Sequence, residues 1–134
     1  MYPKKQLRRY HYKVWMPKYL PDMLREFYVQ LPFVDITTHA ADEMSKDKRG
    51  LIPLPTKDEL FNEKNTLVEV YERLSKDGMP IKKAQKLLIR DTTFSNKYDY
   101  AYVIAREGFI VSSWAIDKGD HHRLTESLYN YYVP

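Results

Sequence analysis

The chain contains no cysteine and no hydrophobic stretch that approaches transmembrane length. The absence of cysteine excludes a disulfide framework, a thiolate zinc site and a cysteine nucleophile, and it is typical of proteins from a reducing compartment. Met1 to Tyr10 carry four basic side chains that no apolar run follows, so this stretch predicts neither a signal peptide nor a membrane anchor. We therefore expect a cytoplasmic protein with no membrane partner.

The sequence also lacks internal repeats, low-complexity tracts and Gly/Ser-rich linkers, so no composition shift divides it. A length of 134 residues is common for one domain and allows a real core without metal or disulfide staples. We therefore predict a single domain over residues 1–134, of which residues 1–17 form a basic, aromatic N-terminal arm.

The net charge of +4 is distributed unevenly. Six basic residues precede the first acidic residue, Asp22, whereas the remaining 16 of the 22 basic residues face 18 acidic ones. The arm also contains Tyr2, Tyr10, His11, Tyr12 and Trp15. Basic side chains neutralise phosphates and planar rings stack on unpaired bases, so the arm indicates nucleic-acid binding.

The basic residues assigned to this interface are Lys4, Lys5, Arg8, Arg9, Lys13 and Arg49. The alternative is a solvated basic tail whose aromatic side chains fold back onto the domain. The twelve tyrosines of the chain also indicate a surface made for contact, although tyrosine serves in ordinary cores as well.

Apolar residues at helical spacing predict helices in the first half of the chain. One helix is expected to start at Pro21, because proline suits the first helical position, and to end near Leu31. Its apolar stripe consists of Leu20, Leu24, Phe27 and Tyr28. Thr37 or Thr38 can cap a second helix, and the run Ser45–Gly50 has the basic and glycine residues that close one.

A third helix is predicted after the extended connector Leu51–Pro55. Thr56 followed by Glu59 matches a capping box, so a helix should open there and continue to about Lys76. The polar interruption Asn62–Asn65 could split this helix, and the stretch Thr66–Glu72 also alternates like a strand, which leaves the type of this segment open.

From Ile81 onward the pattern changes to strands rich in β-branched and aromatic residues. The predicted strands are Ala84–Asp91, Tyr98–Arg106 and Phe109–Ile116. Glu107-Gly108 matches a tight hairpin turn between the last two, which should therefore be antiparallel neighbours. The expected fold class is α+β, with N-terminal helices packed on a C-terminal antiparallel β-sheet of three to five strands.

His39 lies near the start of the second predicted helix, where an imidazole is held neutral and is suited to general-base work. The alternative is a surface or capping histidine. His39 and Glu43 are one helical turn apart and could share a metal with His121 or His122. No spacing of the zinc-binding kind is present, so we expect neither a metal nor a cofactor.

Lys86 and Arg90 alternate onto one face of the predicted strand, with Leu88 between them. If this face points toward the second helix, the two cations can hold a phosphodiester and stabilise charge that builds on phosphorus. The alternative is a solvent-exposed face with Leu88 as an edge contact. On the last strand, Ser112 and Ser113 alternate, so one of the two hydroxyls faces inward or into a cleft.

Several of these features come in a fixed order along the chain. They are Thr38-His39-Ala40 opening a helix, the basic segment Lys46–Gly50, a strand ending in Arg90, Tyr102–Ile104, the turn Glu107-Gly108, and Ile110–Trp114. This order resembles the small ribonuclease fold of the RelE, barnase and colicin type over about residues 33–117. The likeness is one of pattern and contains no diagnostic motif.

The resemblance implies helices packed on an antiparallel sheet whose concave face cleaves RNA without a metal. It implies His39 as the base that activates the ribose 2′-hydroxyl, Arg90 as the arginine that stabilises the phosphorane, and Ser112 or Ser113 as the hydroxyl of the final strand. Families of this kind often have threonine, histidine or tyrosine at that last position, so the two serines depart from the pattern.

Two hypotheses for function follow. The first is a metal-independent endoribonuclease, or a nuclease-like RNA-binding protein, of phage or toxin type, with His39 as base and with Arg90 and Lys86 as phosphate ligands. An antitoxin is then a possible protein partner. The alternative is a non-catalytic phage or host-takeover protein that binds a protein or nucleic acid through a tyrosine-rich surface.

Overall fold

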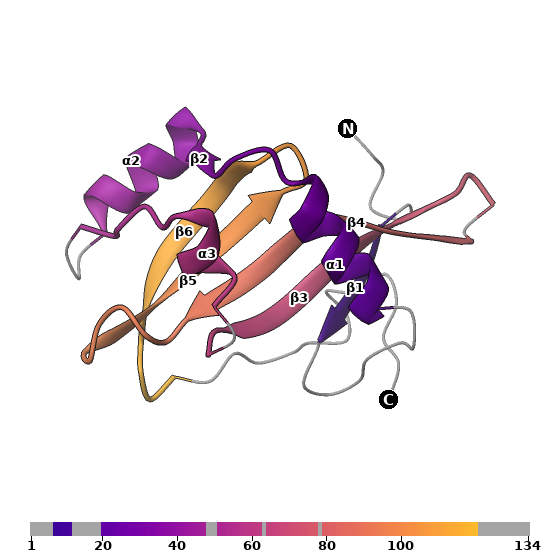
Figure 1. Ribbon diagram of the computed structural model, residues 1–134. Coiled ribbons are helices and arrows are strands. Elements are labelled where there is room, and N and C mark those ends of the chain that lie inside the picture. Colours follow the sequence, from indigo (N-terminus) through magenta and orange to yellow (C-terminus); the bar gives the residue numbers. More distant parts are fainter. Residues whose placement is uncertain (1–6, 12–19, 48–50, 63, 78, 121–134) are drawn as a thin grey trace.

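The computed structural model describes residues 7–11, 20–47, 51–62, 64–77 and 79–120. Six strands form one sheet in the order β1-β3-β4-β5-β6-β2 (Figure 1). The strands are β1 (Leu7–His11), β2 (Asp35–Ile36), β3 (Thr66–Leu74), β4 (Pro80–Asp91), β5 (Tyr98–Ala105) and β6 (Phe109–Asp117). All neighbours are antiparallel except β2, which runs parallel to β6.

The helices precede the four long strands in the chain, so the predicted α+β class is confirmed. They are α1 (Leu20–Gln30), α2 (Thr38–Lys46) and α3 (Lys57–Leu60). The sheet also contains two short strands that the sequence did not predict, β1 from the basic arm and β2 before α2. No helix in the described part of the chain is long and apolar enough to cross a membrane.

The prediction of a long third helix was wrong, because α3 ends after a single turn. The capping box at Thr56 and Glu59 is present, with both of its hydrogen bonds formed. The side-chain amide of Asn65 then donates to the carbonyl oxygens of Glu59 and Leu60, at 3.1 Å each. These bonds fold the chain back at the end of α3, and the alternating residues that follow form β3.

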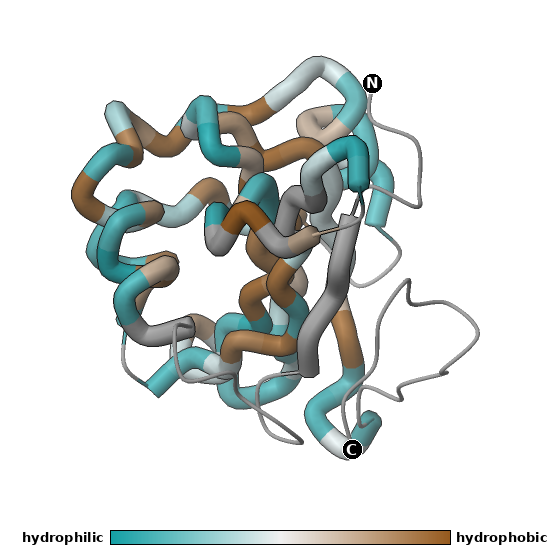
Figure 2. The backbone as a smooth tube through the Cα atoms, turned by 90° about the vertical axis from the view of Figure 1, so that its right-hand side faces the viewer, coloured by the Kyte–Doolittle hydropathy of each residue, from teal (hydrophilic) through white to brown (hydrophobic). Residues whose placement is uncertain are grey.

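The core lies between the helices and one surface of the sheet, which we call the helix face. Leu87 and Ile89 of β4, with Tyr102 and Ile104 of β5, supply this face and are almost fully buried. Each large apolar side chain buried in this way contributes roughly 2 kcal/mol to folding. Figure 2 shows several hydrophobic stretches in the middle of the molecule and hydrophilic stretches around them.

The hydroxyl of Tyr102 donates to the carbonyl oxygen of Pro53 at 2.7 Å. This bond ties the connector between α2 and α3 to the centre of the sheet. Burial is the main reason that the pKa of Tyr102 is raised above its ordinary value.

The opposite surface of the sheet, which we call the second face, carries a separate buried cluster. Its members are Val68, Leu88, Ala101 and Val103, with Tyr71, Val111, Trp114 and Ile116 packed against them. Alternation along β4 explains the division, because Leu87 and Ile89 reach the helix face and Leu88 must therefore reach the second face. No buried residue of the three described helices belongs to this cluster.

The turn between β5 and β6 depends on Gly108, whose φ of 102° lies in the region that favours glycine. Its carbonyl oxygen accepts a hydrogen bond from the backbone N–H of Asp35 at 3.0 Å, which starts the pairing of β2 with β6. A Cβ atom at Gly108 would lie only 2.5 Å from the carbonyl oxygen of Phe33. The turn and the docking of β2 therefore both need a residue without a side chain.

We expect Gly108→Ala to lower the free energy of unfolding by about 2 kcal/mol, because the change combines positive-φ strain with the clash against Phe33. Gly119→Ala is the matched control, since a Cβ atom at Gly119 meets nothing within 4 Å. That control should change stability by less than about 0.5 kcal/mol. Urea unfolding followed by circular dichroism measures both, and equal stability of the two variants would contradict this account of the turn.

Candidate functional site

α2 lies beside β6, and carboxylates from α2 and from its C-cap residue accept hydrogen bonds from backbone N–H groups of β6. The carboxylate of Glu43 accepts hydrogen bonds from the backbone N–H of Ser113 at 3.2 Å and from the hydroxyl of Ser112 at 3.0 Å. The carboxylate of Asp47 accepts one from the backbone N–H of Ala115 at 3.1 Å. The spacing of four residues aligns both carboxylates along the strand, so α2 protects this edge in place of a further strand.

His39 extends from the same helix. Its Nε2 atom lies 3.6 Å from Oε1 of Glu43, and its side chain is 74% exposed. His39, Ser112 and Ser113 therefore lie around Glu43, but the 3.6 Å between Nε2 of His39 and Oε1 of Glu43 is longer than a hydrogen bond. The hydroxyl of Ser113 is buried and donates to the carbonyl oxygen of Ala101 at 2.8 Å, so it is the serine that faces inward.

Arg90 lies elsewhere, on the second face of β4, and is almost fully buried. Its Nε atom donates to Oδ2 of Asp99 at 2.7 Å, and Nη2 donates to the carbonyl oxygen of Asp117 at 3.4 Å. The ammonium group of Lys118 donates to the other carboxylate oxygen of Asp99 at 2.8 Å. Asp99 thus binds two cations, and the guanidinium of Arg90 is engaged inside the protein.

Lys86 shares the second face with Arg90, as the sequence predicted. Its ammonium group lies 5.6 Å from the centroid of the Tyr71 ring, within the range of a cation–π contact. The condition for a shared phosphate site, that this face points toward the second helix, is not met. Leu87 and Ile89 occupy the face that meets the helices. Lys86, Leu88 and Arg90, which alternate with them along β4, therefore point away from the helices.

The five predicted catalytic residues therefore form two groups. His39, Ser112 and Ser113 surround Glu43 beside β6, whereas the two cations lie on the second face of β4, with β5 between the strands. The two groups share no interaction partner in the described ranges. The sequence had marked Glu43 only as a possible metal ligand, because its bond to β6 depends on a strand seventy positions away.

The basic arm contributes β1, which pairs with β3 and so lies at one edge of the sheet. Arg8 is opposite Glu72, and Arg9 is opposite Tyr71. Tyr71 is in turn opposite Lys86 of β4, so Arg9, Tyr71 and Lys86 occupy one row of cross-strand positions. Of the other residues predicted to bind nucleic acid, Lys4, Lys5, Lys13 and Arg49 lie outside the described residues.

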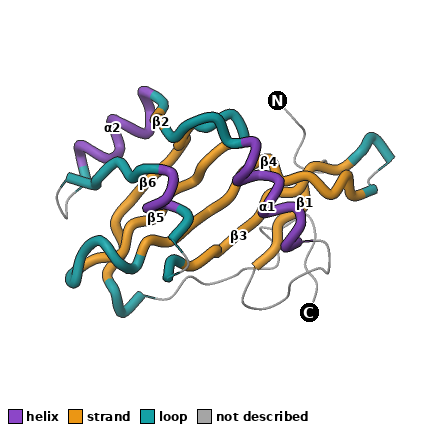
Figure 3. The backbone as a smooth tube through the Cα atoms, viewed as in Figure 1, coloured by secondary structure: helices purple, strands orange, loops and turns teal. Residues whose placement is uncertain are grey.

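We define the basic edge as β1 together with residues 71–86 of the β3–β4 hairpin. It contains seven basic residues, Arg8, Arg9, Arg73, Lys76, Lys82, Lys83 and Lys86, and two acidic residues, Glu72 and Asp77. Figure 3 shows the end of this hairpin extending beyond α1 and β1. The fold thus brings two basic segments from distant parts of the chain side by side.

The described residues include only part of the predicted tyrosine-rich surface. Tyr100 and Tyr102 are core residues, whereas Tyr28, Tyr71 and Tyr98 are at least partly exposed. His121 and His122, considered as metal ligands with His39, lie outside the described residues, and within those residues no three His, Asp or Glu side chains could hold a metal ion.

Comparison with models of protein families, with curated proteins and with solved structures finds no match.

The pKa of Asp99 is lowered from its ordinary value. Burial is the largest single influence and raises it, but the hydrogen bonds and charges of Lys118 and Arg90 together outweigh burial. The charged carboxylate therefore stabilises the fold at pH values above the pKa of the unfolded chain. This contribution is lost as the pH falls through the lower pKa of the folded protein.

We expect Asp99→Asn to lower the free energy of unfolding by about 3 kcal/mol at neutral pH, because the buried guanidinium of Arg90 loses its countercharge. The difference from the parent should shrink to nearly zero as the pH falls below the folded pKa of Asp99. Urea unfolding at a series of pH values measures this. Asp22→Asn, which removes an exposed pair with Arg25, is the control and should have little effect at any pH. A pH-independent loss in the Asp99 variant would contradict the assignment.

Proposed function

We propose that this protein binds single-stranded nucleic acid, RNA foremost, through the basic edge and does not cleave it. The observation that carries the proposal is the pairing of β1 with β3, which places Arg8 and Arg9 next to the basic β3–β4 hairpin. Neither segment alone concentrates as much charge as the two together.

Electrostatics supports a polyanionic partner. The seven basic and two acidic residues of the basic edge give a local net charge larger than the +4 of the whole chain. Each lysine or arginine that meets a phosphate releases condensed counterions, which makes such binding strong at low salt and weak at high salt. The projecting hairpin provides an extended surface along which a backbone can run (Figure 1).

The row of Arg9, Tyr71 and Lys86 adds a means to hold an unpaired base. The Tyr71 ring is half-buried on the second face of the sheet, with Lys86 beside it. Aromatic side chains on a sheet surface stack on bases without reading their sequence, and adjacent cations bind the flanking phosphates. This chemistry favours single strands over duplexes, whose bases are already stacked.

The placement of Arg90 favours binding over cleavage. Phosphoryl transfer needs a cation that reaches the developing charge on phosphorus. Arg90 is the strand arginine to which the resemblance gave that role, and its guanidinium donates to Asp99 and to the carbonyl oxygen of Asp117 instead.

We expect the double variant Lys83→Glu, Lys86→Glu to weaken binding of labelled oligouridine at least roughly tenfold, because two attractive interactions with phosphates become repulsive. The salt dependence, as the slope of log affinity against log salt, should decrease by about 0.7 for each phosphate that is no longer neutralised. Fluorescence anisotropy measures both, and oligothymidine tests whether RNA is preferred over DNA.

The matched control is a double variant with the same charge change on distant surfaces, Lys46→Glu with Lys97→Glu, because both lysines are exposed and lie outside the basic edge. It should bind within about twofold of the parent. Equal weakening in both double variants would mean that the change in net charge alone explains the weaker binding, and it would contradict a localised interface. Deleting residues 1–17 is a poorer test, because the deletion also removes β1 from the sheet.

A second candidate is the metal-independent endoribonuclease of the RelE, barnase and colicin type. The contact between His39 and Glu43 favours it, since a carboxylate beside an exposed imidazole matches a base and an acid for 2′-hydroxyl attack.

If the protein is such an enzyme, cleavage of labelled RNA in EDTA should yield a cyclic phosphate and fall at least roughly a hundredfold in His39→Ala. Gel analysis of the products measures this, with Asp42→Ala on the same helix as the control. Failure of the parent protein to cleave would exclude this candidate and leave the binding proposal intact.

A further inference from the structure

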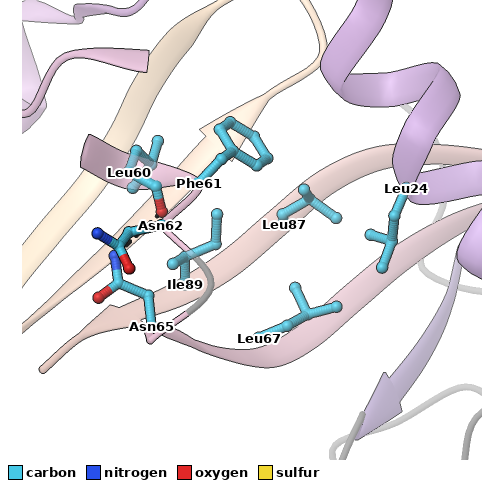
Figure 4. A pocket seen from close by; sticks show the side chains of 8 residues that line it. All are labelled: Leu24, Leu60, Phe61, Asn62, Asn65, Leu67, Leu87 and Ile89. Atoms are coloured by element: carbon cyan, nitrogen blue, oxygen red, sulfur yellow. Dashed lines mark hydrogen bonds between the residues drawn. The ribbon is translucent and has the colours of Figure 1, made fainter. Parts of the chain in front are cut away.

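An apolar pocket of about 280 Å³ opens on the helix face of the sheet, between α1 and the chain segment that joins α3 to β3 (Figure 4). Its floor consists of the buried side chains of Leu60, Leu87 and Ile89. Its rim consists of half-buried side chains, among them Leu24 of α1 and Leu67 of β3, and of the exposed side chain of Asn62. The pocket therefore extends into the core and is open to solvent at its mouth.

Hydrogen bonds hold the pocket open from two sides. On one side, Tyr28 of α1 donates to the carboxylate of Asp58 at 2.8 Å, and Lys57 donates to the carbonyl oxygen of Leu31 at 3.2 Å. These bonds fix α1 against α3. A pocket braced in this way does not have to be ordered when a ligand binds, which lowers the entropic cost of binding.

Asn65 braces the other side. Its side-chain amide reaches the end of α3, and its side-chain oxygen accepts from the backbone N–H of Thr92 at 3.3 Å. The neighbouring Asn62 accepts from the backbone N–H of Lys64 at 2.8 Å. No hydrogen bond donated by the side-chain amide of Asn62 is present among the described residues, so this group is available to a ligand.

The chemistry of the lining selects the ligand. Figure 4 shows the two asparagines at one end of the pocket and Leu24 at the other. The remaining lining is aliphatic apart from the ring of Phe61, and no charged side chain of the described residues takes part. An uncharged ring fits the apolar part, and a carbonyl oxygen on it would accept from Asn62.

We propose that this pocket binds a small neutral aromatic molecule with one hydrogen-bond acceptor, of the aryl ketone class. The site goes beyond nucleic-acid binding and does not depend on it, because Leu67, Leu87 and Ile89 lie on the helix face. Tyr71 and the Lys86 ammonium beside its ring lie on the second face instead.

The test is a titration of the methyl-labelled full-length protein with acetophenone, followed by NMR. Ethylbenzene, which has the same ring and chain length without the carbonyl, serves as the matched probe. We expect saturable shifts in the methyl signals of Leu24, Leu67, Leu87 and Ile89, with a Kd on the order of 1 mM for acetophenone. Binding of ethylbenzene should be roughly fivefold weaker, because it leaves Asn62 without a partner.

Two variants control the result. Leu24→Trp fills the mouth of the pocket and should abolish the saturable shifts. Asn62→Ala should remove the preference for acetophenone while it keeps the affinity for ethylbenzene. Absence of shifts in the parent, shifts that survive Leu24→Trp, or equal binding of both probes by the parent would overturn the proposal. Sedimentation that shows self-association of the parent but not of Leu24→Trp would overturn it in favour of a second copy as the occupant.

Discussion

The antiparallel pairing of β1 with β3 is the interaction on which the functional account depends. It aligns Leu7–His11 with residues 69–73, about sixty positions later in the chain, and so brings the basic arm beside the β3–β4 hairpin. Because cross-strand neighbours share a face, the pairing also creates the row in which Arg9, Tyr71 and Lys86 follow one another. A basic tail alone binds phosphates weakly and without orientation, whereas pairing in a sheet fixes the backbone of this segment beside the basic hairpin.

A second constraint is the alternation of side chains along β4. Leu87 and Ile89 must face the helices to complete the core, so Lys86, Leu88 and Arg90 face the other way. This separation explains why the histidine of α2 and the cations of β4 do not meet in one site. It also explains why Arg90 needs Asp99, since a buried guanidinium without a countercharge would be strongly destabilising.

The sequence was most informative where local chemistry decides the structure. Thr37 and Thr56 cap their helices as predicted, and the turn at Gly108 joins two antiparallel strands. It was misleading after Leu60, because apolar residues at helical spacing resume at Leu67 beyond the polar interruption Asn62–Asn65. In the structure the side-chain bonds of Asn65 end the helix at this interruption. The sequence could not reveal the partner of β1, the bond from Glu43 to β6, or the pair of Arg90 with Asp99. Each of these joins residues far apart in the chain or depends on which face of the sheet the helices cover.

The most direct test of the account is to titrate isotope-labelled protein with oligouridine and to follow the backbone amide signals by NMR. Binding at the basic edge predicts shifts concentrated in β1, in residues 71–73 of β3 and in residues 82–86 of β4, with α2 and the end of β6 unchanged. Shifts centred on His39 and Ser112, or no shifts at low salt, would contradict the assignment of the basic edge as the nucleic-acid interface.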